Sequence, residues 1–305
     1  MEITKKNGNV CFNEEKHIYW KEHTDKKFIS VTTLIHNYQQ PFDEYFWSRY
    51  KTLESTVGKE IFANYKTQIL NTHKIDKNLL DELNIDEKSF IKDVELLILT
   101  WLKTKTESCD RGTAIHLAQE NKFYTSEVHD IKKFDFGGKV NLTGEFKCKK
   151  NNYDLSEENG IYPEFLIYYE SPDGEIKIAG QVDLIIKQGN DVYVLDYKSN
   201  KELKFKSGRD FKTKRNAMMN FPLNQFMDCN MEHYKLQLST YAWMLQQMYP
   251  HLNIISLTII HYDHNDNVNY YQLSYVKKEV ELMINHYKKE LNTEKKKEKR
   301  KRIEF

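Results

Sequence analysis

The chain has 305 residues, of which 39% are hydrophobic and 13% aromatic, enough to bury a sizeable core. Charged residues make up 30% and are interspersed, and the mean hydropathy is −0.75, which together exclude a globally disordered chain. The net charge of +1 favours no class of partner by itself.

The N-terminal part of the chain predicts a hairpin followed by helices. Residues 8–30 alternate apolar and polar around a polar turn, which is typical of a β-hairpin. Ser30 and Thr32 are candidate N-caps for a short helix through Ile35. Residues 42–125 show no strand pattern, and their apolar residues recur at helical spacing. This region is therefore predicted to be a helical lobe, with helices over 43–72, 79–103 and 112–123.

The second half of the chain predicts a sheet with helices. Three short segments are rich in β-branched and aromatic residues and are separated by the turn sequences SPDG and QGN, which indicates a three-strand meander. An amphipathic helix is expected at 232–248, a further strand at 254–262 and a last helix at 276–291. The predicted fold class is α/β, a mixed sheet flanked by helices. The strands of the meander are 161–170, 176–187 and 191–197.

Positive charge is concentrated in two runs. Lys201 to Arg215 holds seven basic and two acidic residues, and Lys295 to Arg302 (KKKEKRKR) holds seven basic and one acidic residue. Such runs are usually solvated faces or tails, and they indicate nucleic-acid contact only beside a nuclease site. In the helical lobe, aromatic residues alternate with Arg49 and Lys51, a pattern that suits base stacking with phosphate contact, unless the aromatic residues pack the lobe onto the sheet. These aromatic residues are Tyr45, Phe46, Trp47 and Tyr50.

The cysteines and the N-terminus indicate a reducing compartment. The four cysteines are scattered and form no CxxC pair, which favours neither a zinc knuckle nor a disulfide scaffold. The N-terminus lacks an apolar signal core, and the longest apolar stretch, Val94 to Leu102, is too short to span a bilayer. We expect a soluble intracellular protein, cytoplasmic or nucleoid-associated and not secreted. The cysteines are Cys11, Cys109, Cys148 and Cys229.

Two adjacent predicted strands carry the candidate catalytic and metal-binding residues. Asp183 lies in the middle of an apolar strand, where an unpaired carboxylate is costly. Asp196 and Lys198 are two residues apart, so their side chains leave the same face of the next strand. Converging carboxylates need a cation, and Mg²⁺ or Mn²⁺ prefers such oxygen ligands. Lys198 would then hold or activate a water. The alternative is that Asp183 caps a strand and Asp196–Lys198 is a surface ion pair.

Four motifs in order resemble the RecB-like branch of the PD-(D/E)XK nucleases. GQVDLI and VLDYKS look like its motifs II and III, RGTAIH (111–116) is similar to its G-x-x-x-H motif, and QLSTY (237–241) resembles its Q-x-x-x-Y motif. SVTTLI and WSRYK look like the N-terminal region of mitochondrial genome maintenance exonucleases and related phage exonucleases. The resemblance covers roughly residues 15–265 and is strongest from 111 to 245.

The resemblance implies a restriction-endonuclease-like core and a division of the chain into four parts. The expected parts are an N-terminal hairpin with a short helix (1–41), a helical lobe ending in the histidine motif (42–125), a nuclease core (126–292) and a basic C-terminal tail (293–305).

The resemblance also assigns roles to residues. Asp183, Asp196, Lys198 and His116 are implied to be catalytic, and the backbone carbonyl of Tyr197 joins His116 and the two aspartates as a metal ligand. Glu164 either binds metal through water or faces solvent. Gln237 and Tyr241 are implied to handle substrate, with Gln237 near the catalytic lysine or a phosphate and Tyr241 against the DNA, or they are a surface glutamine and a core tyrosine. Ser199 bonds a phosphate or the backbone, and Arg111 is a further substrate candidate.

The function implied is a DNA exonuclease that hydrolyses phosphodiester bonds with Mg²⁺ or Mn²⁺ and favours single strands or frayed ends. Some relatives hold an iron–sulfur cluster, but Cys229 is the only late cysteine here, so no cluster is expected. The expected partners are DNA, above all single-stranded, and a single-strand-binding, recombination or replication protein. If the origin is viral, the location is the host cytoplasm. The alternatives are a structure-specific endonuclease and a DNA-end-binding subunit with a vestigial site.

Overall fold

The computed structural model describes residues 2–209 and 213–303, with side chains to Lys296. The chain forms two compact units. The sheet unit comprises residues 1–39, 112–207 and 218–305, and the helical unit comprises 40–111 and 208–217. The predicted lobe therefore ends earlier than expected, because residues 112–125 belong to the sheet unit. Among the described residues, no helix has both the length and the apolar character needed to cross a bilayer.

The N-terminal hairpin is part of a four-stranded antiparallel meander. Its strands pair in chain order, and the helix α1 (Val31–His36) follows directly. Ser30 caps α1, because its hydroxyl accepts a hydrogen bond from the Thr33 amide at 3.0 Å. Of the two candidate caps, Ser30 is the one used. The strands are β1 (Lys5–Asn7), β2 (Val10–Asn13), β3 (Ile18–Lys21) and β4 (Lys27–Ser30).

The predicted three-strand meander is confirmed. β8 pairs antiparallel with β7 along its whole length and with β9 from Leu184 to Gln188. β9 pairs in parallel with β10, which pairs with β11. Three short strands after residue 125 were not predicted, namely β5 (Val128–Asp130), β6 (Glu145–Cys148) and β11 (Val268–Leu273). The predicted strands are β7 (Asn159–Glu170), β8 (Lys177–Gln188), β9 (Asp191–Lys198) and β10 (Asn253–Tyr262).

The sheet divides along one edge of β8. On the side away from β7, Ile178 and Ala179 pair with β4, whereas pairing with β9 begins only at Leu184. The intervening residues 180–183 pair with neither β4 nor β9 in the described registers. β4 and β9 therefore separate beside this stretch, which ends at Asp183.

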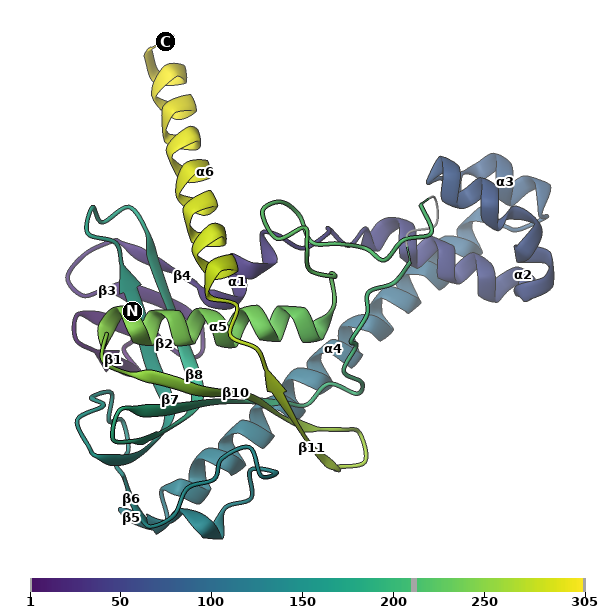
Figure 1. Cartoon of the computed structure of the whole chain (residues 1–305). Helices are drawn as coiled ribbons and strands as arrows, with labels where there is room; N and C mark the ends of the chain where they lie inside the picture. Colours follow the sequence, from purple (N-terminus) through teal and green to yellow (C-terminus); the bar gives the residue numbers. More distant parts are fainter. Residues whose placement is uncertain (1, 210–212, 304–305) are drawn as a thin grey trace. The chain divides into compact units, whose positions relative to one another are not determined.

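Helices cover both faces of the sheet (Figure 1). One face packs against α1, α5 (Asn230–Met248) and α6 (Lys277–Ile303). The other face packs against Phe123, at the end of α4, and the segment that follows it. A mixed sheet with helices on both faces matches the predicted fold class.

The basic C-terminal segment differs from the prediction. The last helix was expected to end at 291, but α6 continues to Ile303. Lys288 bonds Asp173, and Lys295 Nζ lies 3.0 Å from Glu175 Oε1, so α6 contacts the turn between β7 and β8. Parts of the two basic runs lie outside the described residues. These parts are residues 210–212 of the first run and the side chains of residues 297–302 of the second.

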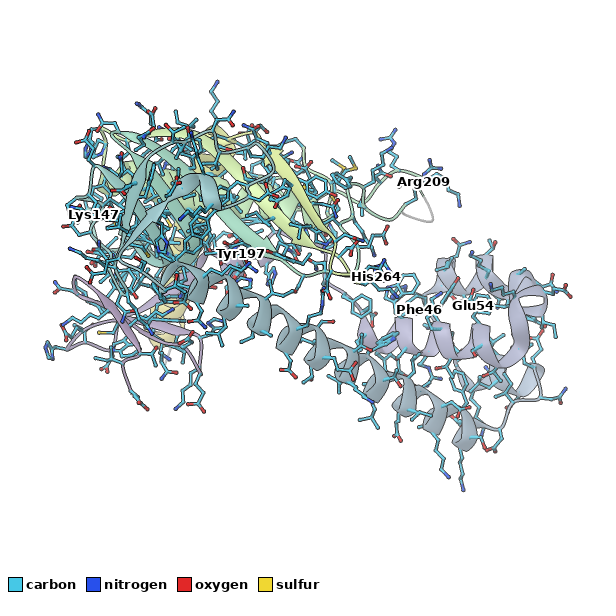
Figure 2. All side chains as sticks on the ribbon, turned by 90° about the horizontal axis from the view of Figure 1, so that it is seen from below. Phe46, Glu54, Lys147, Tyr197, Arg209 and His264 are labelled. Atoms are coloured by element: carbon cyan, nitrogen blue, oxygen red, sulfur yellow. The ribbon has the colours of Figure 1, made fainter. Side chains whose placement is uncertain are left out.

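The helical unit contains α2 (Glu44–Thr72), α3 (Lys77–Glu82) and the first part of α4 (Glu87–Phe123). α2 is interrupted at Gly58, whose φ of 78° and ψ of 158° are not helical. α4 is continuous, so the predicted break between 103 and 112 is wrong. Phe46, which Figure 2 labels on α2, is 3% exposed and belongs to the core of this unit.

Candidate active site

Strands β8 and β9 bring Asp183, Asp196 and Lys198 together. Asp183 is 8% exposed and Asp196 is fully buried. Asp183 Oδ2 accepts a hydrogen bond from the Tyr197 amide at 2.6 Å, just beyond the last β8–β9 pair, Leu184 with Leu195. The Lys198 ammonium contacts Asp196 Oδ2, and its side chain is 16% exposed. The surface ion-pair alternative does not fit these burials.

His116 reaches the carboxylates from the part of α4 that belongs to the sheet unit. Its Nε2 lies 3.1 Å from the Tyr197 carbonyl oxygen, which accepts the ring N–H when the proton is on this nitrogen. Nδ1 then faces Asp183 Oδ1 at 3.5 Å and Glu164 Oε1 at 3.7 Å. A histidine whose second nitrogen is fixed by a carbonyl is the usual arrangement of a metal ligand.

Glu164 is turned into the site by an irregularity in β7. Its φ is +50°, in the left-handed region that non-glycine residues rarely adopt, and Glu164 and Asp183 are the two residues left out of an otherwise constant β7–β8 register. The positive φ interrupts the regular backbone of β7 at Glu164, opposite Asp183. Gln181 donates a hydrogen bond to Glu164 Oε2, and Lys5 Nζ lies 3.7 Å from the same oxygen. The alternative that Glu164 faces solvent is wrong, because its side chain is only 14% exposed.

Three ligand atoms converge at one point. One atom each of His116, Glu164 and Asp183 lies within 4.8 Å of the others, the only such trio among the described residues. One nitrogen and two carboxylate oxygens suit Mn²⁺ or Mg²⁺. Asp196 does not belong to this group, because its Oδ2 faces Lys198 and its Oδ1 lies 3.3 Å from Gln237 Nε2. The residues present therefore fit a divalent cation, with Asp196 beside the trio.

The charges of the site favour an added cation. Burial raises the pKa of Asp183, and burial together with the charge of Asp183 raises the pKa of Asp196 to about 6. Burial alone would lower the pKa of His116, but the carboxylates, Asp183 first, raise it to about 9. The pKa of Lys198 is raised in the same way, against the effect of its burial. Each carboxylate therefore stabilises a nearby cation and resists carrying charge without one.

The comparisons with known proteins agree with this geometry. Residues 75–303 match the PD-(D/E)XK nuclease superfamily. The chain belongs to this superfamily. Metal-dependent cleavage of nucleic acid is therefore the activity that its family indicates, and the α/β sheet with flanking helices is consistent with a PD-(D/E)XK core.

The other comparisons add little. No curated protein matches the chain. A solved structure described as "Crystal structure of SSO0001" is 15% identical, with a TM-score of 0.35, and the match covers 85% of this chain and 73% of that one.

The residues predicted to contact substrate lie in different surroundings. Gln237 Nε2 lies 3.2 Å from the Tyr241 hydroxyl, and both side chains are buried, with Tyr241 3% exposed. The prediction that the Tyr241 ring lies against DNA does not fit this burial. Ser199 lies near α4, where a Cβ on Gly112 would be 3.2 Å from its hydroxyl. Arg111 belongs to the helical unit, and its role stays a prediction.

Sequence reasoning missed three residues of the site. Gln181 and Lys5 contact Glu164, and Tyr234 of α5 lies under Lys198. Gln181 was open to prediction, because it lies two residues before Asp183 and therefore on the same strand face. Lys5 carried no such signal, since it reaches the site only through the packing of β1 against β7.

Proposed function

We propose that the chain is a metal-dependent DNA exonuclease of the RecB-like branch, similar to the mitochondrial genome maintenance and phage exonucleases. The proposal depends chiefly on one observation, the convergence of His116, Glu164 and Asp183 beside Asp196 and Lys198. A DNA-binding subunit with a vestigial site has no need of this full set.

The chain's own residues have separate roles in this proposal. His116, Glu164 and Asp183 would hold the cation, and Asp196 would share its charge from the adjacent position. A bound divalent cation would stabilise negative charge on the scissile phosphate. Lys198, whose raised pKa keeps it protonated, donates hydrogen bonds to the attacking water or to the phosphate. Gln237 orients Asp196 from behind.

A hollow in the helical unit supports the preference for single strands. Its volume is about 710 Å³, and aromatic rings and basic side chains line it with one acid, Glu54, which pairs with Lys51. Stacking rings next to positive charge suit unpaired bases and their phosphates. Phe46 and Tyr50 are nearly covered, so Trp47 and His73 offer the more exposed rings, and Lys66, Arg209 and Lys214 complete the basic lining.

One expected phosphate contact is not present. The Arg49 guanidinium donates to the Ile75 carbonyl at 2.7 and 3.1 Å and lies 5.1 Å from the centre of the Phe90 ring. Arg49 therefore holds α2 to the loop before α3.

The test compares end-labelled linear and covalently closed single-stranded DNA of the same sequence, with Mg²⁺, Mn²⁺ or EDTA. Linear DNA should be degraded with either metal, whereas the circle and the EDTA samples should stay intact and a blunt duplex end should be slower. Lys198→Ala should lower turnover by about two orders of magnitude or more without unfolding the chain. Equal cleavage of the circle would support the endonuclease alternative, and wild-type cleavage by folded Lys198→Ala would reject the site.

A further inference from the structure

The Lys198 ammonium lies over an aromatic ring that comes from a different element. Its Nζ is 4.8 Å from the centre of the Tyr234 ring, within the range of a cation–π contact. Tyr234 belongs to the first half of α5 and is partly buried. On its other side Lys198 contacts Asp196. The ammonium is thus held between a carboxylate and a ring.

The ring of Tyr234 is fixed at both ends. Its Cα belongs to α5, and its hydroxyl donates to Asn200 Oδ1 at 2.6 Å. The Asn200 backbone is itself anchored, because its carbonyl accepts a hydrogen bond from His261 Nε2 at 2.7 Å when that nitrogen carries the proton. His261 is 4% exposed, so this anchor lies inside the protein. The ring therefore holds its position independently of Asp196.

The two partners of Lys198 respond differently to added positive charge. Asp196 lies beside the His116, Glu164 and Asp183 trio, so a cation at the trio competes with the ammonium for its charge. A neutral tyrosine ring is not a ligand for a hard divalent cation, which prefers oxygen donors with negative charge or carbonyl character. The attraction between the Tyr234 ring and the Lys198 ammonium is therefore retained when a cation also interacts with the carboxylates.

We propose that Tyr234 is a positioning residue. Its ring holds the Lys198 ammonium in the active site when the Asp196 carboxylate interacts with a bound metal ion. The inference rests on the proposed function of Lys198. It assigns to the ring face of Tyr234 a role separate from its hydroxyl, which only fixes the ring.

The first measurement detects the contact between Lys198 and the Tyr234 ring by NMR, without any need for turnover. Lysines are reductively methylated with ¹³C, and the Lys198 signal is assigned by its loss in Lys198→Arg. In the wild type the signal should be shifted upfield by the ring in EDTA and should stay so with Mg²⁺ in the absence of DNA. The shift should persist in Tyr234→Phe and disappear in Tyr234→Leu. A signal at the position of the solvent-exposed lysines in the wild type would overturn the proposal.

The second measurement tests the effect of the Tyr234 ring on turnover. Tyr234→Leu should lower kcat between about two- and thirty-fold, the range that a cation–π contact supports, with KM nearly unchanged. Tyr234→Phe, which keeps the ring, should retain most of the wild-type kcat. The control is Tyr275→Leu, another partly buried tyrosine, whose hydroxyl bonds Gln246 near the far end of α5. It should leave kcat unchanged.

The outcomes separate the two proposals. If the wild type cleaves no DNA with either metal, the proposed function fails, and the methyl signal still decides whether the ring holds Lys198. If the wild type is active and Tyr234→Leu has the same kcat, the positioning role is wrong. If Tyr234→Leu does not fold, Tyr234→Met replaces it, since it too removes the ring and should abolish the methyl shift and lower kcat.

Discussion

Gly180 shows how the packing of α5 on the sheet reaches the active site. It lies in β8, where β4 and β9 separate, and Tyr241 packs directly against it. A Cβ at Gly180 would lie 2.6 Å from Tyr241 Cε1 and 3.3 Å from Val31 Cγ2. The Tyr241 ring is 3% exposed and has no solvent to move into. Gly180→Ala must therefore displace the ring or the strand.

The expected cost follows from two opposing effects. Overfilling a packed core typically costs about 1–3 kcal/mol. Alanine also restricts the unfolded chain, which offsets about 0.4–1 kcal/mol. The net loss should be on the order of 1–2 kcal/mol, which lowers the urea midpoint by roughly 0.3–2 M for an m-value of about 1–3 kcal/mol/M. Activity should fall too, because Gln237 bonds both the Tyr241 hydroxyl and Asp196.

The assay is urea unfolding in EDTA, followed by cleavage of linear DNA. Gly208→Ala is the matched control, because nothing lies within 4 Å of a Cβ at that position. In a Tyr241→Leu background the same Gly180→Ala change should cost less, since the ring that it meets is gone. An unchanged midpoint for Gly180→Ala, or an equal cost in both backgrounds, would refute the packing argument.

Three further predictions concern the metal, the C-terminal helix and a buried histidine. Asp183→Asn and Asp196→Asn should each weaken Mn²⁺ binding about tenfold or more by calorimetry, without loss of stability in EDTA, because the fold raises the pKa of both carboxyls. Unchanged affinity in both variants would exclude the site. Truncation after Asn292 should leave the fold intact, since the Lys295 ion pair that it removes is half-exposed, and should flatten the salt dependence of DNA binding. An identical slope would mean that the segment binds no phosphates. Burial lowers the pKa of His233, so its neutral form is favoured by the fold, and its contribution to stability is lost as the pH falls below 6.5. An NMR titration that places this pKa above 6.5 would contradict the assignment.

The strands of the core could be predicted because their sequences carry two independent signals. β7, β8 and β9 combine β-branched and aromatic residues with the turn sequences between them. β5 and β6 have three and four residues, too few for either signal to develop. The continuity of α4 was missed for another reason. Residues 102–110 are exposed on every side, so this stretch has no apolar periodicity to indicate a helix.

The site was predictable where strand geometry alone decides it. Asp196 and Lys198 share a strand face by their spacing, and the short QGN turn brings Asp183 to them. The orientation of Glu164 was not predictable, because it depends on a positive φ that a glutamate rarely adopts. Lys5 is likewise a product of tertiary packing, since β1 packs against β7 from the far end of the sequence.

The face of α5 explains why the prediction that Tyr241 lies against DNA does not fit the structure. Tyr234, Gln237 and Tyr241 follow the helical spacing i, i+3 and i+7, so they share one face, as the sequence indicated for the last two. That face is turned to the strands, where the three residues meet Lys198, Asp196 and Gly180 in order. A helix face that is buried in this way cannot also stack on bases. Its effect on nucleic acid has to pass through the catalytic groups that it orients, which is why loss of any one of its side chains should change turnover more than affinity.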